Sequence, residues 1–192
     1  LPAPPKPRSA FGLPERAHLY VCPQSLFKIH PDFDRVLAAL LARDPAALVV
    51  LIAGRDRHLD ALLRARLERA APGAAGRLRF LRPMPLADFL GLVAASDVML
   101  DPLHYSGGNT SLEAFALGTP IVTWPGAFMR GRHTHGFYKL MGLDDCVAAD
   151  HAQYVEIALR LGREPDFRRH VTRRVLDRVP ALFDHAPSIR AI

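Results

Sequence analysis

The sequence predicts an α/β protein: a Rossmann-like, doubly wound parallel sheet of about six strands with helices on both faces. Short β-rich apolar runs alternate along the chain with longer segments whose apolar residues recur at helical spacing. The run at residues 47–53 is apolar throughout, which is typical of a central parallel strand that is covered on both faces. A glycine pair, Gly107 and Gly108, separates one such strand from the helix that follows it.

The order of the elements follows from these patterns and from the Pro and Gly residues between them. The predicted strands lie at residues 19–22, 47–53, 77–81, 98–100, 121–124 and 145–148. The predicted helices lie at residues 31–41, 57–71, 86–93, 109–117, 136–141, 152–161 and 165–179.

The length of 192 residues and a hydrophobic content of 49% indicate one folded domain and exclude a disordered chain. We predict a proline-rich linker at residues 1–17, the domain at 18–180 and a tail at 181–192. A linker at the first position suggests that the chain is a piece of a longer protein.

The net charge of +6 comes mostly from arginines in helical stretches, which we interpret as solvated surface. No nucleic-acid-binding motif is recognisable, and no stretch has the roughly 20 apolar residues that a membrane span needs. Cys22 and Cys146 each lie in an apolar run, so we expect buried free thiols and a reducing, cytoplasmic compartment.

The stretch at residues 97–126 carries the strongest functional signal. Its glycine pair allows close approach of a ligand to the backbone, and Asn109 and Thr110 open the next helix. The free N–H groups and the dipole at a helix N-terminus attract an anion such as a phosphate. Glu113, one turn later, is placed to accept hydrogen bonds from ribose hydroxyls. An ordinary capped helix is the alternative interpretation of the glycine turn, and Glu113 favours a nucleotide.

Residues 22–34, 80–101 and 97–126 together resemble the donor-binding half of GT-B glycosyltransferases, and most closely the O-GlcNAc transferase and SPINDLY family. The resemblance covers most of residues 19–161. It implies an inverting transfer of GlcNAc from UDP-GlcNAc to Ser or Thr of a protein, without a bound metal or another cofactor. It also implies partners outside this chain: an N-terminal half that carries the acceptor cleft and the catalytic base, and a tetratricopeptide array.

The resemblance also implies roles for individual residues near the ends of the first and third strands. Lys28 matches a lysine that contacts the donor diphosphate and stabilises the departing nucleotide. Gln24 and Ser25 occupy the place of a family amide pair, and which of the two faces the donor stays open. Met84 matches a backbone contact to the base, whereas Phe89 is equally compatible with a base-stacking ring and with plain core packing.

Within the central stretch the family pattern is only partly kept. Gly108 replaces a family histidine, so the backbone N–H groups of residues 108–110 are expected to hold more of the diphosphate. Thr110 matches a donor-binding threonine, and Glu113 replaces an aspartate while keeping a carboxylate for the ribose. Arg132 has a counterpart in the loop after the fifth predicted strand, near the sugar or the acceptor.

Other functions remain open at this stage. The chain could be a nucleotide-sugar-binding module without catalysis, use UDP-glucose or GDP-fucose, or modify Asn. A dinucleotide-dependent oxidoreductase is disfavoured because no G-x-G-x-x-G follows the first strand. His133 and His135 form an isolated H-x-H, which we interpret as loop residues and not as metal ligands.

Overall fold

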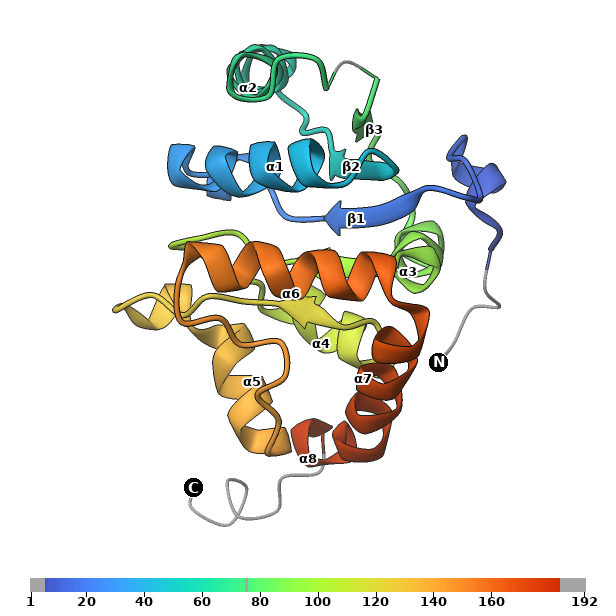
Figure 1. Cartoon of the computed structure of the whole chain (residues 1–192), viewed down its shortest axis with the longest axis vertical. Helices are drawn as coiled ribbons and strands as arrows, with labels where there is room; N and C mark the ends of the chain where they lie inside the picture. The colour runs from blue at the N-terminus through green and yellow to red at the C-terminus, as the bar shows by residue number, and fades with distance from the viewer. Residues whose placement is uncertain (1–5, 75, 184–192) are drawn as a thin grey trace.

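The computed structural model describes residues 6–74 and 76–183. Its centre is a five-stranded sheet in which every pairing is parallel, in the order β3-β2-β1-β4-β5 (Figure 1). The α/β class, the Rossmann-like parallel sheet and the covering of both faces are confirmed. The strands are β1 His18–Cys22, β2 Ala47–Ile52, β3 Leu78–Leu81, β4 Val98–Leu100 and β5 Ile121–Val122.

The predicted count of about six strands is wrong by one, because residues 145–148 form a single bridge and not a strand. Thr123 pairs with Val147 in this bridge, through Thr123 N–H to Cys146 O (3.0 Å) and Ala148 N–H to Thr123 O (2.8 Å). The ladder cannot extend forward, since Pro125 has no N–H to donate. At the other end of the bridge, Ile121 O, which faces the Cys146 N–H side, already accepts from the Tyr138 hydroxyl at 2.7 Å.

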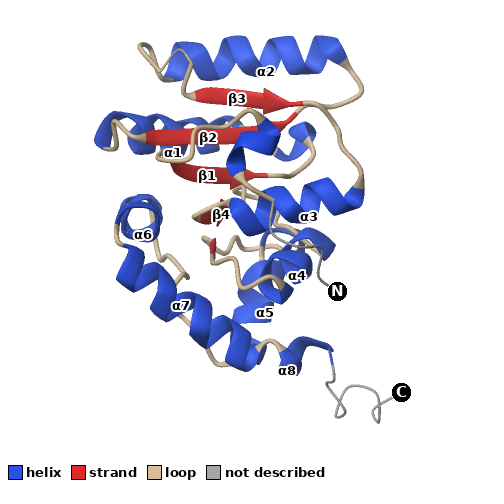
Figure 2. Cartoon of the chain, turned by 90° about the vertical axis from the view of Figure 1, so that its right-hand side faces the viewer, coloured by secondary structure: helices blue, strands red, loops and turns tan. Residues whose placement is uncertain are grey.

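Helices cover both faces of the sheet. Figures 1 and 2 show α1 and α6 on one face and α3 and α4 on the opposite face. The α-helices are α1 Pro31–Arg43, α2 Arg57–Ala70, α3 Leu86–Ala95, α4 Asn109–Ala116, α5 His133–Met141, α6 His151–Arg163, α7 Pro165–Arg178 and α8 Pro180–Phe183. Short 3₁₀ helices lie at η1 Arg8–Phe11, η2 Leu26–Lys28 and η3 Met129–Gly131.

Helix α1 illustrates how the sequence produces these elements. Pro31 occupies the first turn, where its missing N–H costs nothing, and the His30 side chain accepts the Asp32 N–H at 3.2 Å. The apolar side chains of Phe33 and Leu37 recur one turn apart and are buried. The helix therefore starts at a fixed point directly beyond β1, on the edge of the sheet where the loops gather.

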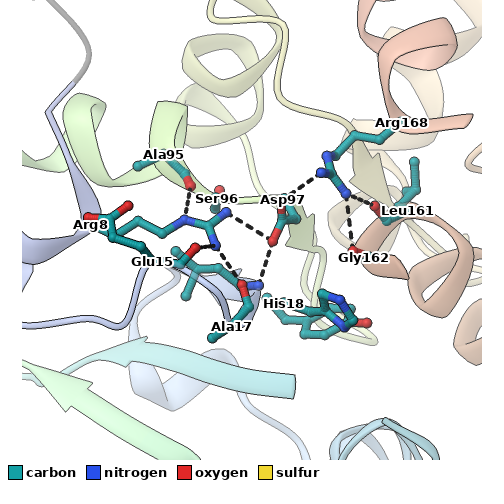
Figure 3. A network of polar contacts seen from close by, with 12 residues as sticks. Arg8, Glu15, Ala17, His18, Ala95, Ser96, Asp97, Leu161, Gly162 and Arg168 are labelled. Carbon is teal, nitrogen blue, oxygen red and sulfur yellow. Dashed lines mark hydrogen bonds and ion pairs between the residues drawn. The ribbon is translucent and has the colours of Figure 1, made fainter. Parts of the chain in front are cut away.

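The segment before β1 is packed on the domain in its described part, residues 6–17, although we expected an extended linker there. Arg8 Nη2 lies 2.9 Å from Asp97 Oδ2, and its Nε donates to Ala95 O at 2.9 Å (Figure 3). Leu13 is buried in the core. Residues 1–5 of the predicted linker and 184–192 of the predicted tail lie outside the described residues.

Asp97, directly before β4, is the centre of this network. Its Oδ2 also accepts the Leu19 N–H at 2.7 Å, and its Oδ1 lies 3.1 Å from Arg168 Nη2. Arg168 in turn donates to Leu161 O and Gly162 O at the end of α6 (Figure 3). One carboxylate thus joins the N-terminal segment, two strands and the last helices at the amino edge of the sheet.

Two further findings concern the described residues as a whole. No helix among them combines the length and the apolar character that crossing a membrane requires. Cys22 and Cys146 are both free and buried, and burial raises the pKa of each thiol to about 12.

Candidate functional site

The candidate site lies where the carboxyl ends of β1 and β4 meet. In a parallel sheet all strands end at one edge, and ligands bind in the crevice beyond it, next to the point where the strand order reverses. Here the reversal falls between β1 and β4, because β1 continues to β2 on one side and β4 to β5 on the other. The loop of residues 23–30 and the loop of residues 101–108 flank this point.

Asp101, the first residue after β4, holds the loop of residues 101–108 in place by hydrogen bonds. Its carboxylate is buried, with 2% of the residue exposed, and accepts three hydrogen bonds: from Gly107 N–H (2.8 Å), Ser106 Oγ (2.7 Å) and Thr123 Oγ1 (2.7 Å). Burial raises the pKa of Asp101, and these donors oppose the rise. A buried carboxylate therefore fixes the conformation of this loop.

Gly107 has to be glycine because the loop leaves no space for a side chain. A Cβ on Gly107 would lie 2.4 Å from Ser111 Oγ, 2.7 Å from Gln24 Nε2 and 2.9 Å from Thr110 Oγ1. By contrast, a Cβ on Gly108 would meet no atom within 4 Å. The two glycines are therefore not equivalent: the side chains around Gly107 pack directly against its backbone, whereas Gly108 borders open space.

Helix α4 begins at this loop with its first N–H groups available. Gly108 is the N-cap and has no side chain to cap the helix, while its carbonyl accepts the Ser111 and Leu112 N–H groups. Within the described residues the N–H groups of Gly108, Asn109 and Thr110 have no hydrogen-bond acceptor. A helix N-terminus in this state favours an anion, by its dipole and by its free donors.

Lys28 supplies a positive charge beside this helix start. Its Nζ donates to Gln24 Oε1 at 3.0 Å and to Ser106 O at 3.3 Å, and it lies 4.5 Å from the centre of the Tyr105 ring. Gln24 is buried, and its Nε2 donates to Thr110 Oγ1 in the first turn of α4. Partial desolvation lowers the pKa of Lys28, and the nearby charge of Asp101 opposes this shift.

The hydrogen bonds through Gln24 link Lys28 to α4, so the structure brings together four of the predicted residues: Lys28, Gln24, Thr110 and Gly107. Asn109 lies exposed at the first position of the helix. The arrangement offers one ammonium group and a set of backbone donors to the same small volume. A diphosphate has the charge and the oxygen atoms to use both.

A cavity of about 460 Å³ adjoins this cluster under the loops that follow β1, β2 and β3. Gln24, Ser25, Met84 and Phe89 all line it, although they come from separate parts of the chain. Met84 and Phe89 are half-buried, so each has one side against the core and the other toward the cavity. Both alternatives for Phe89, packing and ring stacking, are thus compatible with its position.

The remaining two predicted residues differ in their surroundings. Glu113 is half-buried one turn into α4, and burial raises the pKa of its carboxyl group. Arg132 is exposed and donates to Gly126 O at 2.8 Å, within its own loop. It lines a separate cavity with Met129 and His133. The structure therefore does not bring Arg132 into the Lys28 cluster.

His133 and His135 are helical and not loop residues, which corrects our expectation. Helix α5 begins at His133, three residues earlier than Gly136, so both histidines lie in its first turn. Thr134, between them, is buried, and its hydroxyl lies 2.9 Å from those of Ser106 and Ser111. This contact anchors the start of α5 to the glycine loop and places the two histidines outside that hydroxyl cluster.

Several residues of the site were missed at the sequence level, notably Asp101, Tyr105 and Ser106. Asp101 had a usable signal, since a carboxylate at the carboxyl end of a buried strand, just before a glycine turn, is placed to hold that turn. Tyr105 and Ser106 had none, because their contacts with Lys28 and Thr134 depend on loops far apart in sequence.

Comparison with known proteins agrees with this geometry. The model of glycosyl transferase family 41 matches residues 6–186. The UDP-N-acetylglucosamine–peptide N-acetylglucosaminyltransferase of Giardia intestinalis is 25% identical over 181 residues, which are 92% of this chain and 12% of that protein. A solved structure of a Thermobaculum terrenum O-GlcNAc transferase mutant superposes with a TM-score of 0.75 at 32% identity, over 87% of this chain and 35% of that one.

The C-terminal CMP-Kdo-binding domain of WaaA from Acinetobacter baumannii shares the fold alone, at 16% identity and a TM-score of 0.62. It is matched over 92% of its own length and over 88% of this chain. The chain therefore corresponds in extent to one domain of that architecture, and to about a third of the Thermobaculum chain.

Proposed function

The chain belongs to glycosyl transferase family 41, and from this premise we propose that it is the donor-binding half of an inverting protein glycosyltransferase. The proposed reaction moves GlcNAc from UDP-GlcNAc to a Ser or Thr hydroxyl of a protein. The names of the similar Giardia and Thermobaculum proteins support this donor and this acceptor. Because the chain spans only part of those proteins, the activity is proposed for the complete enzyme.

One observation carries the proposal: the Lys28 ammonium group and the uncapped start of α4 belong to one hydrogen-bonded unit. Lys28 donates to Gln24, and Gln24 donates to Thr110 in the first turn of the helix. A diphosphate bound there would replace the Gln24 and Ser106 oxygens as the acceptors for Lys28. The lysine is thus already positioned for a phosphate, which reduces the reorganisation that binding requires.

The proposed chemistry is a displacement at the anomeric carbon. A hydroxyl oxygen of the acceptor forms the new bond as the bond to the diphosphate oxygen breaks, with inversion. The leaving nucleoside diphosphate takes the electron pair and gains negative charge, which Lys28 and the α4 N–H groups would stabilise. The proton of the acceptor passes to a base that we expect outside this chain, and no metal ion is required in this scheme.

The cavity lined by Met84 and Phe89 is the proposed place of the nucleobase, with Glu113 toward the ribose. Its position beside Gln24 and Ser25 supports this assignment, because a base and a diphosphate in one nucleotide must occupy adjacent sites. Uridine is our first choice, and guanosine, as in GDP-fucose, is the alternative. Arg132 is proposed to act nearer the sugar or the acceptor.

A thermal-shift comparison tests donor binding directly. UDP, GDP and UDP-GlcNAc are each added to the chain, and we expect the uridine compounds to raise the unfolding temperature, because a ligand that binds only the folded state stabilises it. Lys28→Ala should remove most of this shift. Lys139→Ala is the matched control, because Lys139 is an exposed lysine on α5 and its loss should leave the shift intact.

A transfer assay with the intact gene product separates an enzyme from a binding module. We expect radiolabelled GlcNAc to pass to protein hydroxyls, and Lys28→Ala to reduce kcat more than it raises KM, since the leaving charge is largest in the transition state. Nucleotide binding without transfer would favour the non-catalytic module. Transfer undiminished in Lys28→Ala would refute the role of Lys28, and a preference for Asn acceptors or for another sugar would correct the substrate.

A further inference from the structure

A second group of side chains, distinct from the Lys28 cluster, lies between the start of α1 and the loop after β4. We propose that His30, Asp32 and His104 form a binding site for a divalent transition-metal ion, with Zn²⁺ as the ion that the ligand set suits best. One ligand atom from each residue can be chosen so that all three lie within 4.8 Å of one another. The inference is independent of the proposed sugar transfer.

The distances between the side chains are already close to those of a metal site. His104 Nε2 lies 2.8 Å from Asp32 Oδ2, and His30 Nδ1 lies 3.3 Å from the same oxygen. The two imidazole rings meet edge to face, with their centres 4.7 Å apart. Ligand atoms at about 2.0–2.2 Å from a tetrahedral Zn²⁺ lie roughly 3.3–3.6 Å from each other. Asp32 and His104 would therefore move apart by about half an ångström, and the two imidazole nitrogens, which lie within 4.8 Å of each other, would adjust to the same separation.

The backbone delivers these side chains from two separate segments. His30 and Asp32 flank Pro31, which fixes the first turn of α1. His104 comes from the opposite loop and is the one non-glycine residue of the described chain with a positive φ, at 70°. A positive φ is uncommon for any residue other than glycine, and here it accompanies the approach of His104 to Asp32.

The ligand chemistry selects the class of ion. Two imidazoles and one carboxylate suit Zn²⁺ and its first-row neighbours, whereas Mg²⁺ and Ca²⁺ prefer an all-oxygen set. All three residues are exposed, so the ion can enter from solvent. The ion would replace two contacts by bonds to the metal: the His104–Asp32 contact at 2.8 Å and the longer one, at 3.2 Å, in which the His30 nitrogen caps α1.

Three protein ligands leave part of the coordination sphere open. Asp32 and His104 line a cavity of about 610 Å³, together with Trp124, Phe128 and His151. His151 Nε2 is buried there and has no hydrogen-bond partner among the described residues. The open positions of the ion are therefore available to water or to a ligand in this cavity. Sites with three protein ligands and an open position are typical of exchangeable or catalytic zinc.

Isothermal titration of the tag-free chain with ZnCl₂, and the visible spectrum of the Co²⁺ form, test the site. We expect one ion per chain and the intense absorption of tetrahedral Co²⁺. Cys22 and Cys146 do not compete, because both are buried. The variants His30→Asn, Asp32→Asn and His104→Asn should each weaken Zn²⁺ binding by about tenfold or more. Asn can cap a helix at position 30 and tolerates a positive φ at position 104, so these variants should fold.

The matched control is the double variant His133→Gln, His135→Gln, which removes the only H-x-H of the sequence. It should bind Zn²⁺ as the unaltered chain does, since His133 and His135 are not in the cluster. The proposal is overturned if the unaltered chain binds no stoichiometric ion. It is equally overturned if the three Asn variants, shown to be folded by circular dichroism, retain full affinity, or if the control loses as much affinity as they do.

Discussion

Two buried aspartates flank the same short strand, β4, and only one of them has cationic partners. Asp97, before the strand, is surrounded by the cations Arg8 and Arg168, at 2.9 and 3.1 Å. Asp101, after the strand, accepts only from neutral groups, the Gly107 N–H and the hydroxyls of Ser106 and Thr123. The amino edge of the sheet is thus charge-neutralised, whereas the carboxyl edge is not.

The two ends of β4 thus differ in role: one stabilises the fold, and the other lies beside the candidate site. At the amino edge the charges compensate each other within the fold, and the network joins segments distant in sequence (Figure 3). At the carboxyl edge the uncompensated Asp101 lies beneath Lys28 and opposes the lowering of its pKa. Lys28 itself has no carboxylate within ion-pair distance in the described chain and keeps its charge available for a ligand.

The largest effect should come from breaking the amino edge. Asp97→Ala leaves Arg8 and Arg168 partly buried without a counter-charge and removes the acceptor of the Leu19 N–H. The free energy of unfolding should fall by about 3 kcal/mol or more, measured by urea denaturation. Nucleotide affinity of the molecules that remain folded should be unchanged. Loss of affinity at full stability would contradict the separation of the two edges.

A substitution at the carboxyl edge should affect the free energy of unfolding less, but should weaken nucleotide binding strongly. Gly107→Ala forces its new Cβ against Ser111 and Thr110, so the free energy of unfolding should fall by about 1–3 kcal/mol. The displaced start of α4 should lose UDP affinity by more than tenfold, measured by calorimetry. Gly136→Ala is the control, since Gly136 lies within α5, outside the Lys28 cluster, and its Cβ would meet no atom within 4 Å. Equal loss in both variants would contradict the packing argument.

The pH dependence of nucleotide binding sharpens the comparison further. Desolvation lowers the pKa of Lys28 in the folded state, so its charged form reduces the free energy of unfolding at neutral pH. This reduction disappears as the pH rises from the folded-state pKa to the pKa of lysine in the unfolded chain. Affinity for a diphosphate needs the charged form and should therefore decrease over that same alkaline range, below the range of an ordinary lysine. The affinity of Lys28→Arg should stay constant there. A decrease of equal size in Lys28→Arg would assign the titration to another group.

The smallest effect is expected from an ion pair outside both networks. Arg43 and Glu156 lie 2.7 Å apart, but their side chains are 50% and 54% exposed. Solvent screens such a pair, so Arg43→Ala should reduce the free energy of unfolding by about 0.5 kcal/mol or less. Urea denaturation in low and high salt measures it. A loss comparable to that of Asp97→Ala would show that burial does not decide the strength of these pairs.

The sequence was sufficient to predict the sheet, the order of its elements and the glycine turn, because each of these depends on local patterns. Its predictions were less accurate where a neighbour decides the outcome. Residues 145–148 have the composition of a strand, yet the short β5 leaves them only Thr123 to pair with. Residues 1–17 are rich in Pro, as linkers are, yet Arg8 is held by the distant Asp97. The hydrogen bond from Arg132 to Gly126 O was likewise not predictable from the spacing of residues in the sequence.

The roles of the site residues depend on both kinds of information. The general geometry of parallel sheets places the loop of Lys28 and the start of α4 at the same edge, and the family resemblance singled out Lys28 and Thr110 within them. The cluster of His30, Asp32 and His104 does not follow from that geometry, because it depends on the unusual backbone of His104. Residues whose contacts depend on one special φ angle are invisible to periodicity and composition.

The two thiols provide a natural reporter of motion at the ends of the sheet. Only the thiolate is alkylated rapidly, and with a pKa of about 12 and no exposure neither cysteine should react with iodoacetamide in the native state. Cys22 ends β1 beside the loop that carries Lys28, whereas Cys146 lies beside β5. The labelling rate of each cysteine, measured by mass spectrometry, would therefore report how often the structure around it opens locally. A bound nucleotide should slow the labelling of Cys22 and leave that of Cys146 unchanged.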